Sequence, residues 1–254
     1  MPEVRYRSEE MSSSNPAPEK RRVGRPRKRL SAEPNGEPRE QILSAAAALF
    51  AARGIGEVSM LEIAEQSGLG QSSLYYWYRR KELIVAELLQ QVNRLPLAFA
   101  KQLETEGDGA DVQLYRLVQF DVRTVCDFPL EITEVHRLSR REKSAFDTYW
   151  KERRELTATL ERLITRGIEA GLFRTVDAYL CALTIIAEDE SVQNWFQRDA
   201  RPKPRGQKIE GDPLAARYRA DEVADFVATQ TLASLIAAPS RVEAVKKRAA
   251  HHPG

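Results

Sequence analysis

Apolar residues recur every three or four positions from about residue 40 to residue 250, and nowhere do they alternate as they would in a strand. The pattern predicts only helices, so the expected fold is all-α. Pro96 is expected to kink or end the helix that starts at Lys81, and TEGDGAD at 105–111 marks a loop. The predicted helices span about 40–53, 59–67, 71–78, 81–95, 112–127, 130–140, 144–170, 177–196, 221–238 and 240–250.

Two short helices joined by a tight turn are predicted between residues 59 and 78. Ser59 and Glu62 have the spacing of a capping box, and Gly68 suits the left-handed residue that ends the first helix. Leu74 and Tyr78 form the inward side of the second helix. This arrangement is a helix-turn-helix, and the second helix turns small polar groups and phenols outward, as a DNA-reading helix would. These outward residues are Gln71, Ser72, Ser73, Tyr75 and Tyr76.

Three consecutive cations, Arg79, Arg80 and Lys81, stand where the next helix begins. A helix N-terminus is unfavourable for cations unless an anion is nearby, and a DNA phosphate would meet that need. Taken alone, the run favours a solvated charged turn. Next to a helix-turn-helix, it favours DNA binding.

The segment from Arg39 to Leu83 resembles the DNA-binding domain of the TetR (tetracycline-repressor-like) family of transcriptional regulators. The match is dense and nearly free of gaps, although it covers under a fifth of the chain. Its matching residues are Ile42, Leu43, Ala45, Ala46, Leu49, Phe50, Gly54, Val58, Ser59, Met60, Ile63, Ala64, Ser67, Gly68, Leu69, Ser73, Leu74, Tyr75, Tyr78, Lys81, Glu82 and Leu83.

Three departures from the family pattern put the operator sequence in doubt, but not the activity. Gly70 replaces the usual Ser or Thr, so a hydroxyl cap is lost. Trp77 and Tyr78 replace a His/Tyr-Phe pair, and Arg79 and Arg80 are more basic than the usual turn. Base or near-base contacts are assigned to Gln71, Ser72, Ser73 and Tyr76. Phosphate contacts are assigned to Ser59, Tyr75, Arg79, Arg80 and Lys81.

The N-terminal segment 1–37 is rich in Ser, Pro, Glu and Arg and is expected to be disordered. Its basic block KRRVGRPRKR, 20–29, centres on Gly24-Arg25-Pro26, which resembles an AT-hook core. Arg25 is therefore a candidate for the minor groove of A·T-rich DNA. A solvated tail with only non-specific phosphate attraction is an equal alternative.

Composition narrows the function further. The net charge is only +2, so DNA affinity must come from a local patch. Two cysteines and three histidines offer no metal site, cofactor site or catalytic constellation, and favour a reduced, cytoplasmic setting. No apolar run has membrane-spanning length, so no membrane partner is expected.

The resemblance implies that the helices after residue 84 bind a small effector and form a homodimer, with 177–196 and 221–238 at the interface. Both helices are apolar over wide arcs, as an isologous dimer requires. Plain core packing is the commoner role for each effector-contact candidate. The acids Glu188, Asp189 and Glu190 are expected to pair with arginines across the dimer or to face water, rather than to meet a cationic ligand. The effector-contact candidates are Tyr115, Phe120, Arg123, Cys126, Phe146, Trp150 and Trp195.

We expect the protein to be a sequence-specific transcriptional regulator. It would act as a repressor that an unknown effector releases from a pseudo-palindromic operator in double-stranded DNA. The alternatives are an architectural DNA binder without an effector, and an all-helical enzyme or carrier that reuses the helix-turn-helix. The expected divisions are a basic arm (1–37), the DNA-binding domain (38–83), the effector and dimerisation domain (84–238) and a tail (239–254).

Overall fold

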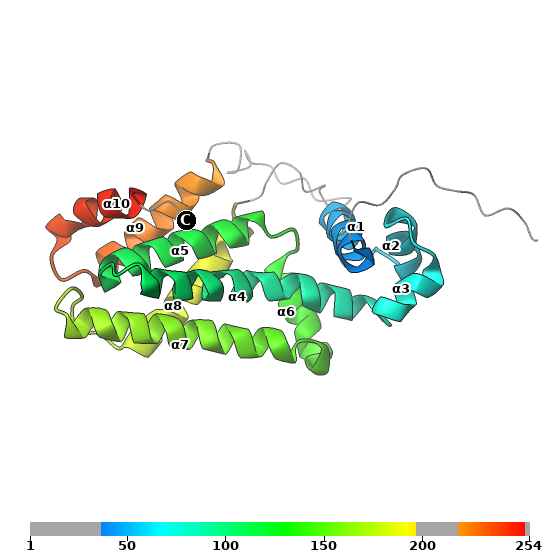
Figure 1. Ribbon diagram of the computed structural model, residues 1–254, viewed down its shortest axis with the longest axis horizontal. Coiled ribbons are helices and arrows are strands. Elements are labelled where there is room, and N and C mark those ends of the chain that lie inside the picture. Colours follow the sequence, from blue (N-terminus) through cyan, green and yellow to red (C-terminus); the bar gives the residue numbers. More distant parts are fainter. Residues whose placement is uncertain (1–36, 197–217, 252–254) are drawn as a thin grey trace, which may run out of the picture. The chain divides into compact units, whose positions relative to one another are not determined.

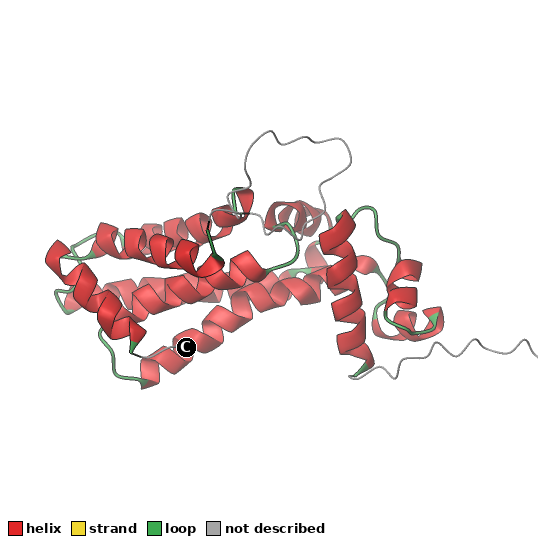
Figure 2. Cartoon of the chain, turned by 90° about the horizontal axis from the view of Figure 1, so that it is seen from above, coloured by secondary structure: helices red, strands yellow, loops and turns green. Residues whose placement is uncertain are grey.

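The computed structural model describes residues 37–196 and 218–251. These residues are helical, apart from loops and one isolated antiparallel bridge between Phe173 and Ile236 (Figure 2). The all-α prediction is therefore confirmed. Arg25, nearly all of the predicted arm and most of the predicted loop 197–219 lie outside the described residues. The helices are α1 (Pro38–Arg53), α2 (Met60–Gln66), α3 (Gln71–Trp77), α4 (Lys81–Thr105), α5 (Ala110–Asp127), α6 (Ile132–Arg141), α7 (Asp147–Glu169), α8 (Ala178–Ser191), α9 (Ala220–Leu235) and α10 (Val242–Ala250).

Helices α1, α2 and α3 enclose a small apolar core. Ile42, Phe50, Ile63 and Leu74 are buried in it, at the positions where the helical spacing places their inward faces. The same core continues along the first half of α4, where Ile84 and its neighbours are buried. The start of α4 is thus packed into the DNA-binding domain that the sequence predicts.

Helix α4 does not end at Pro96 but continues to Thr105. The proline lacks the N–H that would bond to Val92, and this loss is expected to weaken the helix locally. Burial on both sides of the proline compensates, because Leu89, Val92, Phe99 and Leu103 all lie in apolar cores. Helices α4 and α7 lie side by side over much of their length (Figure 1).

Helix α5 is the centre of the second core. It packs against α4, α7, α8, α9 and α10, and almost every residue of its first half is buried. The predicted helix 144–170 is divided in the structure, into the 3-10 turn η1 (Lys143–Ala145) and α7. Gly171 follows α7 with φ of 68°, a left-handed conformation that glycine adopts without steric cost.

Helix α9 ends at Leu235, three residues before the predicted end. The following strand-like residues pair with the segment after α7, where Ala237 N–H donates to Leu172 O at 2.9 Å and Arg174 N–H donates to Leu235 O at 2.9 Å. Helix α8 also ends early, and the short 3-10 turn η2 (Val192–Asn194) completes its predicted length.

Helix α10 follows the 3-10 turn η4 (Pro239–Arg241) and lies in the predicted tail, but its Val245 and Ala249 are buried in the second core. Two buried acids, one in the α4–α5 loop and one in the first turn of α5, explain why it docks. Buried Asp111 pairs with Arg241 at 2.7 Å, and buried Asp108 pairs with Arg248 at 2.8 Å. Buried carboxylates require a charged partner, and the basic residues around α10 supply two.

Candidate nucleic-acid interface and effector cleft

The start of α2 has the predicted capping box. Glu62 N–H donates to Ser59 Oγ at 3.3 Å, and Ser59 N–H donates to Glu62 Oε2 at 2.8 Å. The Ser59 N–H and the Ser59 hydroxyl, which donates to Glu62 Oε2 at 2.7 Å, lower the pKa of Glu62 to about 2, with help from Arg53 at 2.7 Å. The Ser59 hydroxyl, a predicted phosphate contact, is already engaged in holding the helix start.

The turn between α2 and α3 orients the recognition helix. Gly68 has φ of 71°, and Leu69 N–H donates back to Ala64 O at 3.0 Å, so the chain reverses within four residues. Leu74 then anchors α3 with its side chain fully buried. A one-residue shift in this turn would rotate the outward face of α3 away from its present direction.

The outward face of α3 is exposed. Tyr76 is 82% exposed, and Gln71, Ser72, Ser73 and Tyr75 are exposed as well. Trp77, which is not among the predicted contacts, is 42% exposed and meets the Tyr76 ring edge-on at 5.6 Å between centroids. Its position at the end of a predicted recognition helix was the signal available in the sequence.

The three cations at residues 79–81 have different surroundings. Lys81 Nζ donates to the carbonyl oxygens of Ile55 at 2.5 Å and Val58 at 2.7 Å, and lies 3.4 Å from that of Gly56. Arg80 pairs with Glu142, which follows α6. Arg79 is exposed and forms no ion pair with another described residue. Among the three, Arg79 is the cation most available to a phosphate.

A cleft of about 800 Å³ lies beside α4 and α5, below α10. Three of the predicted effector contacts, Tyr115, Phe120 and Arg123, line it. The other four do not, since Cys126 and Phe146 are buried in the cores, Trp150 stacks on His136, and Trp195 lies at the end of η2. The lining residues are Gln91, Val92, Leu95, Phe99, Tyr115, Arg116, Gln119, Phe120, Arg123, Thr124, Asp127, Phe128, Pro129, Asp225, Lys246, Lys247, Ala249 and Ala250.

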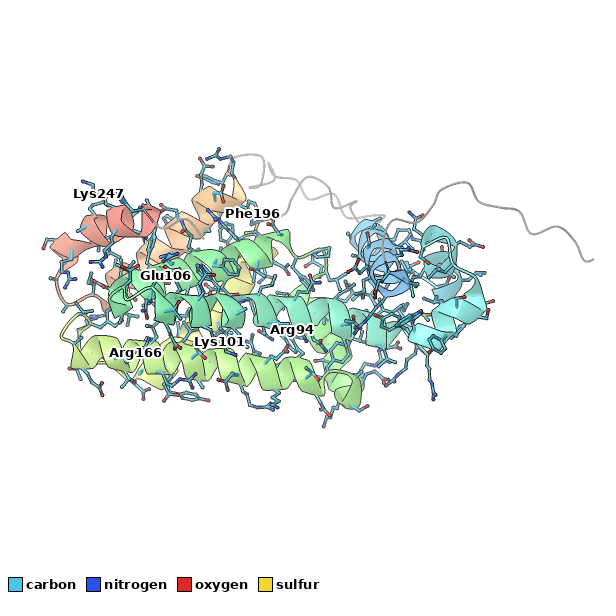
Figure 3. The ribbon with its side chains drawn as sticks, viewed as in Figure 1. Arg94, Lys101, Glu106, Arg166, Phe196 and Lys247 are labelled. Atoms are coloured by element: carbon cyan, nitrogen blue, oxygen red, sulfur yellow. The ribbon has the colours of Figure 1, made fainter. Side chains whose placement is uncertain are left out.

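Aromatic rings and ion-paired side chains both line this cleft. Phe99 and Phe120 stack with centroids 4.4 Å apart, and the Arg116 guanidinium lies 5.6 Å from the Phe99 ring centre while pairing with Glu106. Figure 3 marks Glu106 after the end of α4 and Lys247 on α10. The Tyr115 hydroxyl donates to Asp225, and burial is the main cause of its raised pKa.

A second polar cluster is buried between α5, α6, α7 and α8. The prediction for this trio was arginines across the dimer or water. Glu190 pairs with Arg153 of its own chain, and Glu188 is exposed. Asp189 neither pairs with an arginine of the described residues nor is exposed to solvent. It is 1% exposed, and its hydrogen-bond partner among the described residues is another carboxyl, that of Asp121.

Asp121 on α5, only 6% exposed, accompanies Asp189 in this cluster. Burial raises the pKa of Asp121 to about 7, and burial together with the Asp121 charge raises the pKa of Asp189 well above its usual range. His136 Nε2 lies 2.7 Å from the Tyr149 hydroxyl, and burial lowers the pKa of this imidazole to about 4. At neutral pH the cluster therefore holds a neutral histidine and at least one protonated carboxyl.

The described residues give little support for a metal site, a disulfide or a membrane-spanning helix. They contain no cluster of histidine, cysteine and acidic side chains that suits a metal ion, and both cysteines are free thiols. None of the helices in the described ranges is both long and apolar enough to cross a membrane. The two features that stand out are an exposed helix-turn-helix and a large cleft in an all-helical domain, which together define a ligand-responsive DNA-binding protein.

Comparison with known families agrees with this class. Residues 42–88 match the model described as "Bacterial regulatory proteins, tetR family", and residues 107–205 match "Tetracyclin repressor-like, C-terminal domain". Together the two matches span more than half of the chain. The protein belongs to the TetR family of transcriptional regulators.

Individual relatives are distant. The HTH-type transcriptional regulator TtgR of Pseudomonas putida is 25% identical over 186 residues, covering 66% of this chain and 84% of TtgR. The crystal structure of PfmR, a TetR family regulator from Thermus thermophilus, has a TM-score of 0.60 at 23% identity and covers 75% of this chain and 96% of PfmR. AibR in complex with isovaleryl coenzyme A and operator DNA has a TM-score of 0.53 at 19% identity, covering 80% and 99% of the two chains.

Proposed function

We propose that the protein is a repressor that leaves its operator when a small effector occupies the cleft beside α4 and α5. Helix α4 is the observation that supports this coupling. It begins at Lys81, packed into the DNA-binding domain, and its Val92, Leu95 and Phe99 line the cleft. At 1.5 Å per residue, about 27 Å of continuous helix separates Lys81 from Phe99.

An effector acts through this helix if it binds one arrangement of α4 more tightly than the other. Differential affinity alone then shifts the population toward the arrangement that does not fit the operator. Arg80 takes part in the same change, because its ion pair with Glu142 joins the start of α4 to the residue after α6. The Glu142 carboxylate competes with a phosphate for the Arg80 guanidinium.

Dimerisation is the second part of the proposal. Leu180 on α8 is 58% exposed and Phe226 on α9 is 61% exposed, and Tyr179 and Leu183 are exposed on α8 as well. Large apolar side chains gathered on two helices mark an interaction surface. A two-fold dimer through this face would present two copies of α3 to the half-sites of a pseudo-palindromic operator.

The dimer surface is tested with Leu180→Glu and Phe226→Glu, with Leu95→Glu as a matched control. Leu95 is also a half-exposed leucine but lies in the cleft, away from the proposed interface. We expect the first two variants to be monomeric by light scattering and to lose operator affinity, while the control stays dimeric. A dimeric Phe226→Glu variant with unchanged affinity would contradict this interface.

The regulatory role is tested by selecting genomic fragments with the purified protein and footprinting the fragment that binds best. We expect a protected inverted repeat that competes against random duplex of the same length. Equal recovery of all fragments, with no footprint, would contradict sequence-specific regulation.

A matched pair of variants on α3 tests the orientation of the recognition helix. Tyr76→Ala is expected to reduce the preference for operator over random DNA, because Tyr76 is the most exposed of the aromatic side chains on α3. Tyr75→Ala is expected to weaken both complexes equally, as a phosphate contact would. If Tyr76→Ala keeps the full operator preference, the assigned orientation is wrong.

A further inference from the structure

The cleft is long, and its apolar floor is the strip that Leu95, Phe99 and Phe120 form among polar lining residues. Its lining residues on α5 run from Tyr115 to Asp127, which corresponds to about 18 Å of helix. The stacked Phe99 and Phe120 rings lie in the middle of it. Leu95, 46% exposed on α4, adds a large apolar side chain that no described residue covers fully. This floor matches an extended apolar ligand body better than a compact polar one.

The charges are distributed unevenly along the cleft. Lys246 and Lys247 on α10 line one end. Asp225, the acid at that end, already accepts the Tyr115 hydroxyl and pairs with Lys246 at 3.0 Å. Lys247 is exposed and forms no ion pair with another described residue. An ammonium group has three donors, so both lysines keep N–H groups for a ligand.

The remaining cations of the lining are less available. Arg116 has a buried side chain that pairs with Glu106. Arg123 pairs with Asp221 at 2.7 Å, although both side chains are about half exposed, so the pair offsets the Arg123 charge only in part. The larger share of the positive charge that is open to a ligand therefore lies on α10, at one end of the apolar floor. Such a site complements a molecule with an apolar body and one anionic end, and it disfavours a cationic end by like-charge repulsion.

We propose that the cleft binds an elongated amphipathic anion whose apolar body lies over Leu95, Phe99 and Phe120 and whose carboxylate meets Lys247 and Lys246. Binding of the anion is argued from the cleft alone, whereas its effect on operator binding rests on the proposed function. The helix that supplies the lysines is itself held by Arg241–Asp111 and Arg248–Asp108, so the cationic end keeps its place over α5.

Three probes that share one alkyl chain test the class of ligand. Isothermal titration of the full-length protein is carried out with decanoate, decanol and decyltrimethylammonium, each below its micelle concentration. We expect saturable binding of decanoate, binding of decanol weaker by about fivefold, which is the range of one partly exposed ion pair, and still weaker binding of the cation. Tightest binding of the cation, or no binding of any probe, would overturn the proposal.

Variants locate the two ends of the site. Lys247→Gln is expected to bring the affinity for decanoate down to that for decanol and to leave decanol unchanged. Leu95→Gln is expected to weaken both probes. Arg154→Gln, an exposed cation on α7 outside the cleft, is the control and is expected to change neither. Decanoate binding that survives both cleft variants would place its site elsewhere and refute the assignment.

The operator footprint separates this inference from the proposed function. A footprint without decanoate binding would leave the regulator in place and overturn the ligand class. Decanoate binding that does not alter the footprint would support the site and contradict release by an occupant of this cleft.

Discussion

The buried carboxyl pair Asp121 and Asp189 predicts an unusual loss of stability with rising pH. Burial raises the pKa of Asp121 to about 7 from its usual value near 3.8, so the folded protein keeps a proton that the unfolded chain releases. The stabilisation from that proton is fully present below pH 3.8 and is lost as the pH rises through about 7. Asp189, raised in the same direction, adds to the loss wherever its own proton is released.

His136 acts in the opposite direction at lower pH. Its pKa is lowered from 6.5 to about 4, so its contribution is present above pH 6.5 and is lost as the pH falls through about 4. Between pH 4 and pH 6.5 the histidine and the aspartates change the free energy of unfolding in opposite directions. From pH 6.5 to about pH 8, of these groups, the aspartates alone change it. The release of one proton with a pKa of about 7 lowers the free energy of unfolding by about 1 kcal/mol over that range.

Urea unfolding at several pH values measures this slope, with the protein concentration held constant because dimers gain stability by mass action. We expect the free energy of unfolding to fall by about 1 kcal/mol from pH 6.5 to about pH 8 in the native chain. The double variant Asp121→Asn, Asp189→Asn should show no such fall, because both amides are neutral throughout.

Glu169→Gln, which removes an exposed acid at the end of α7, serves as the control and should keep the native slope. A native stability that is flat or rising over the range, or an equal fall in the double variant, would refute the reasoning.

Three further substitutions test helix packing, the hydrogen bonds of Lys81 and the cap of α2. The first two are each paired with a comparison variant. Gly167→Ala would place a Cβ atom 2.1 Å from Phe173 Cδ2 and should cost about 1–3 kcal/mol of unfolding free energy, whereas Gly56→Ala, with nothing within 4 Å, should change stability little. Lys81→Met leaves the carbonyl groups of Ile55 and Val58 without their donor and should lower the free energy of unfolding by about 1–3 kcal/mol. Arg79→Gln should leave that free energy unchanged. It should instead reduce the slope of log affinity for DNA against log salt concentration by about one. Ser59→Ala removes the cap of α2 and should cost about 1 kcal/mol in a thermal or urea melt, and an unchanged midpoint would show that Glu62 alone holds the helix start.

Most of the helices and the recognition unit follow from local sequence patterns. The capping box at Ser59, the left-handed Gly68 and the inward Leu74 each act within a few residues, so their geometry was predictable and is confirmed. The outward face of α3 follows from the same periodicity. Helix ends that depend on distant residues were predicted less well. Helix α9 stops at Leu235 because its continuation pairs with the segment around Phe173, and Pro96 stays helical because of its packing.

Residue types alone did not separate the effector candidates. Tyr115 and Phe120 line the cleft while Phe146 is core, and nothing in their local sequence distinguishes them. The position of α10 was missed because its docking depends on Arg248 meeting Asp108, 140 residues earlier in the chain.

The class of fold, the helix-turn-helix and the side chains that this unit exposes can be read from the amino-acid sequence, because helix period, caps and turns are interactions between near neighbours. Which charged side chains are already paired depends on how the helices pack. Lys81 is bound to carbonyl groups, Arg80 to Glu142 and Arg153 to Glu190, while Arg79 and Lys247 form no such pairs among the described residues. The same packing buries Asp189 beside Asp121. Ion pairing and burial depend on residues far apart in the chain, and their positions are set only when the helices pack.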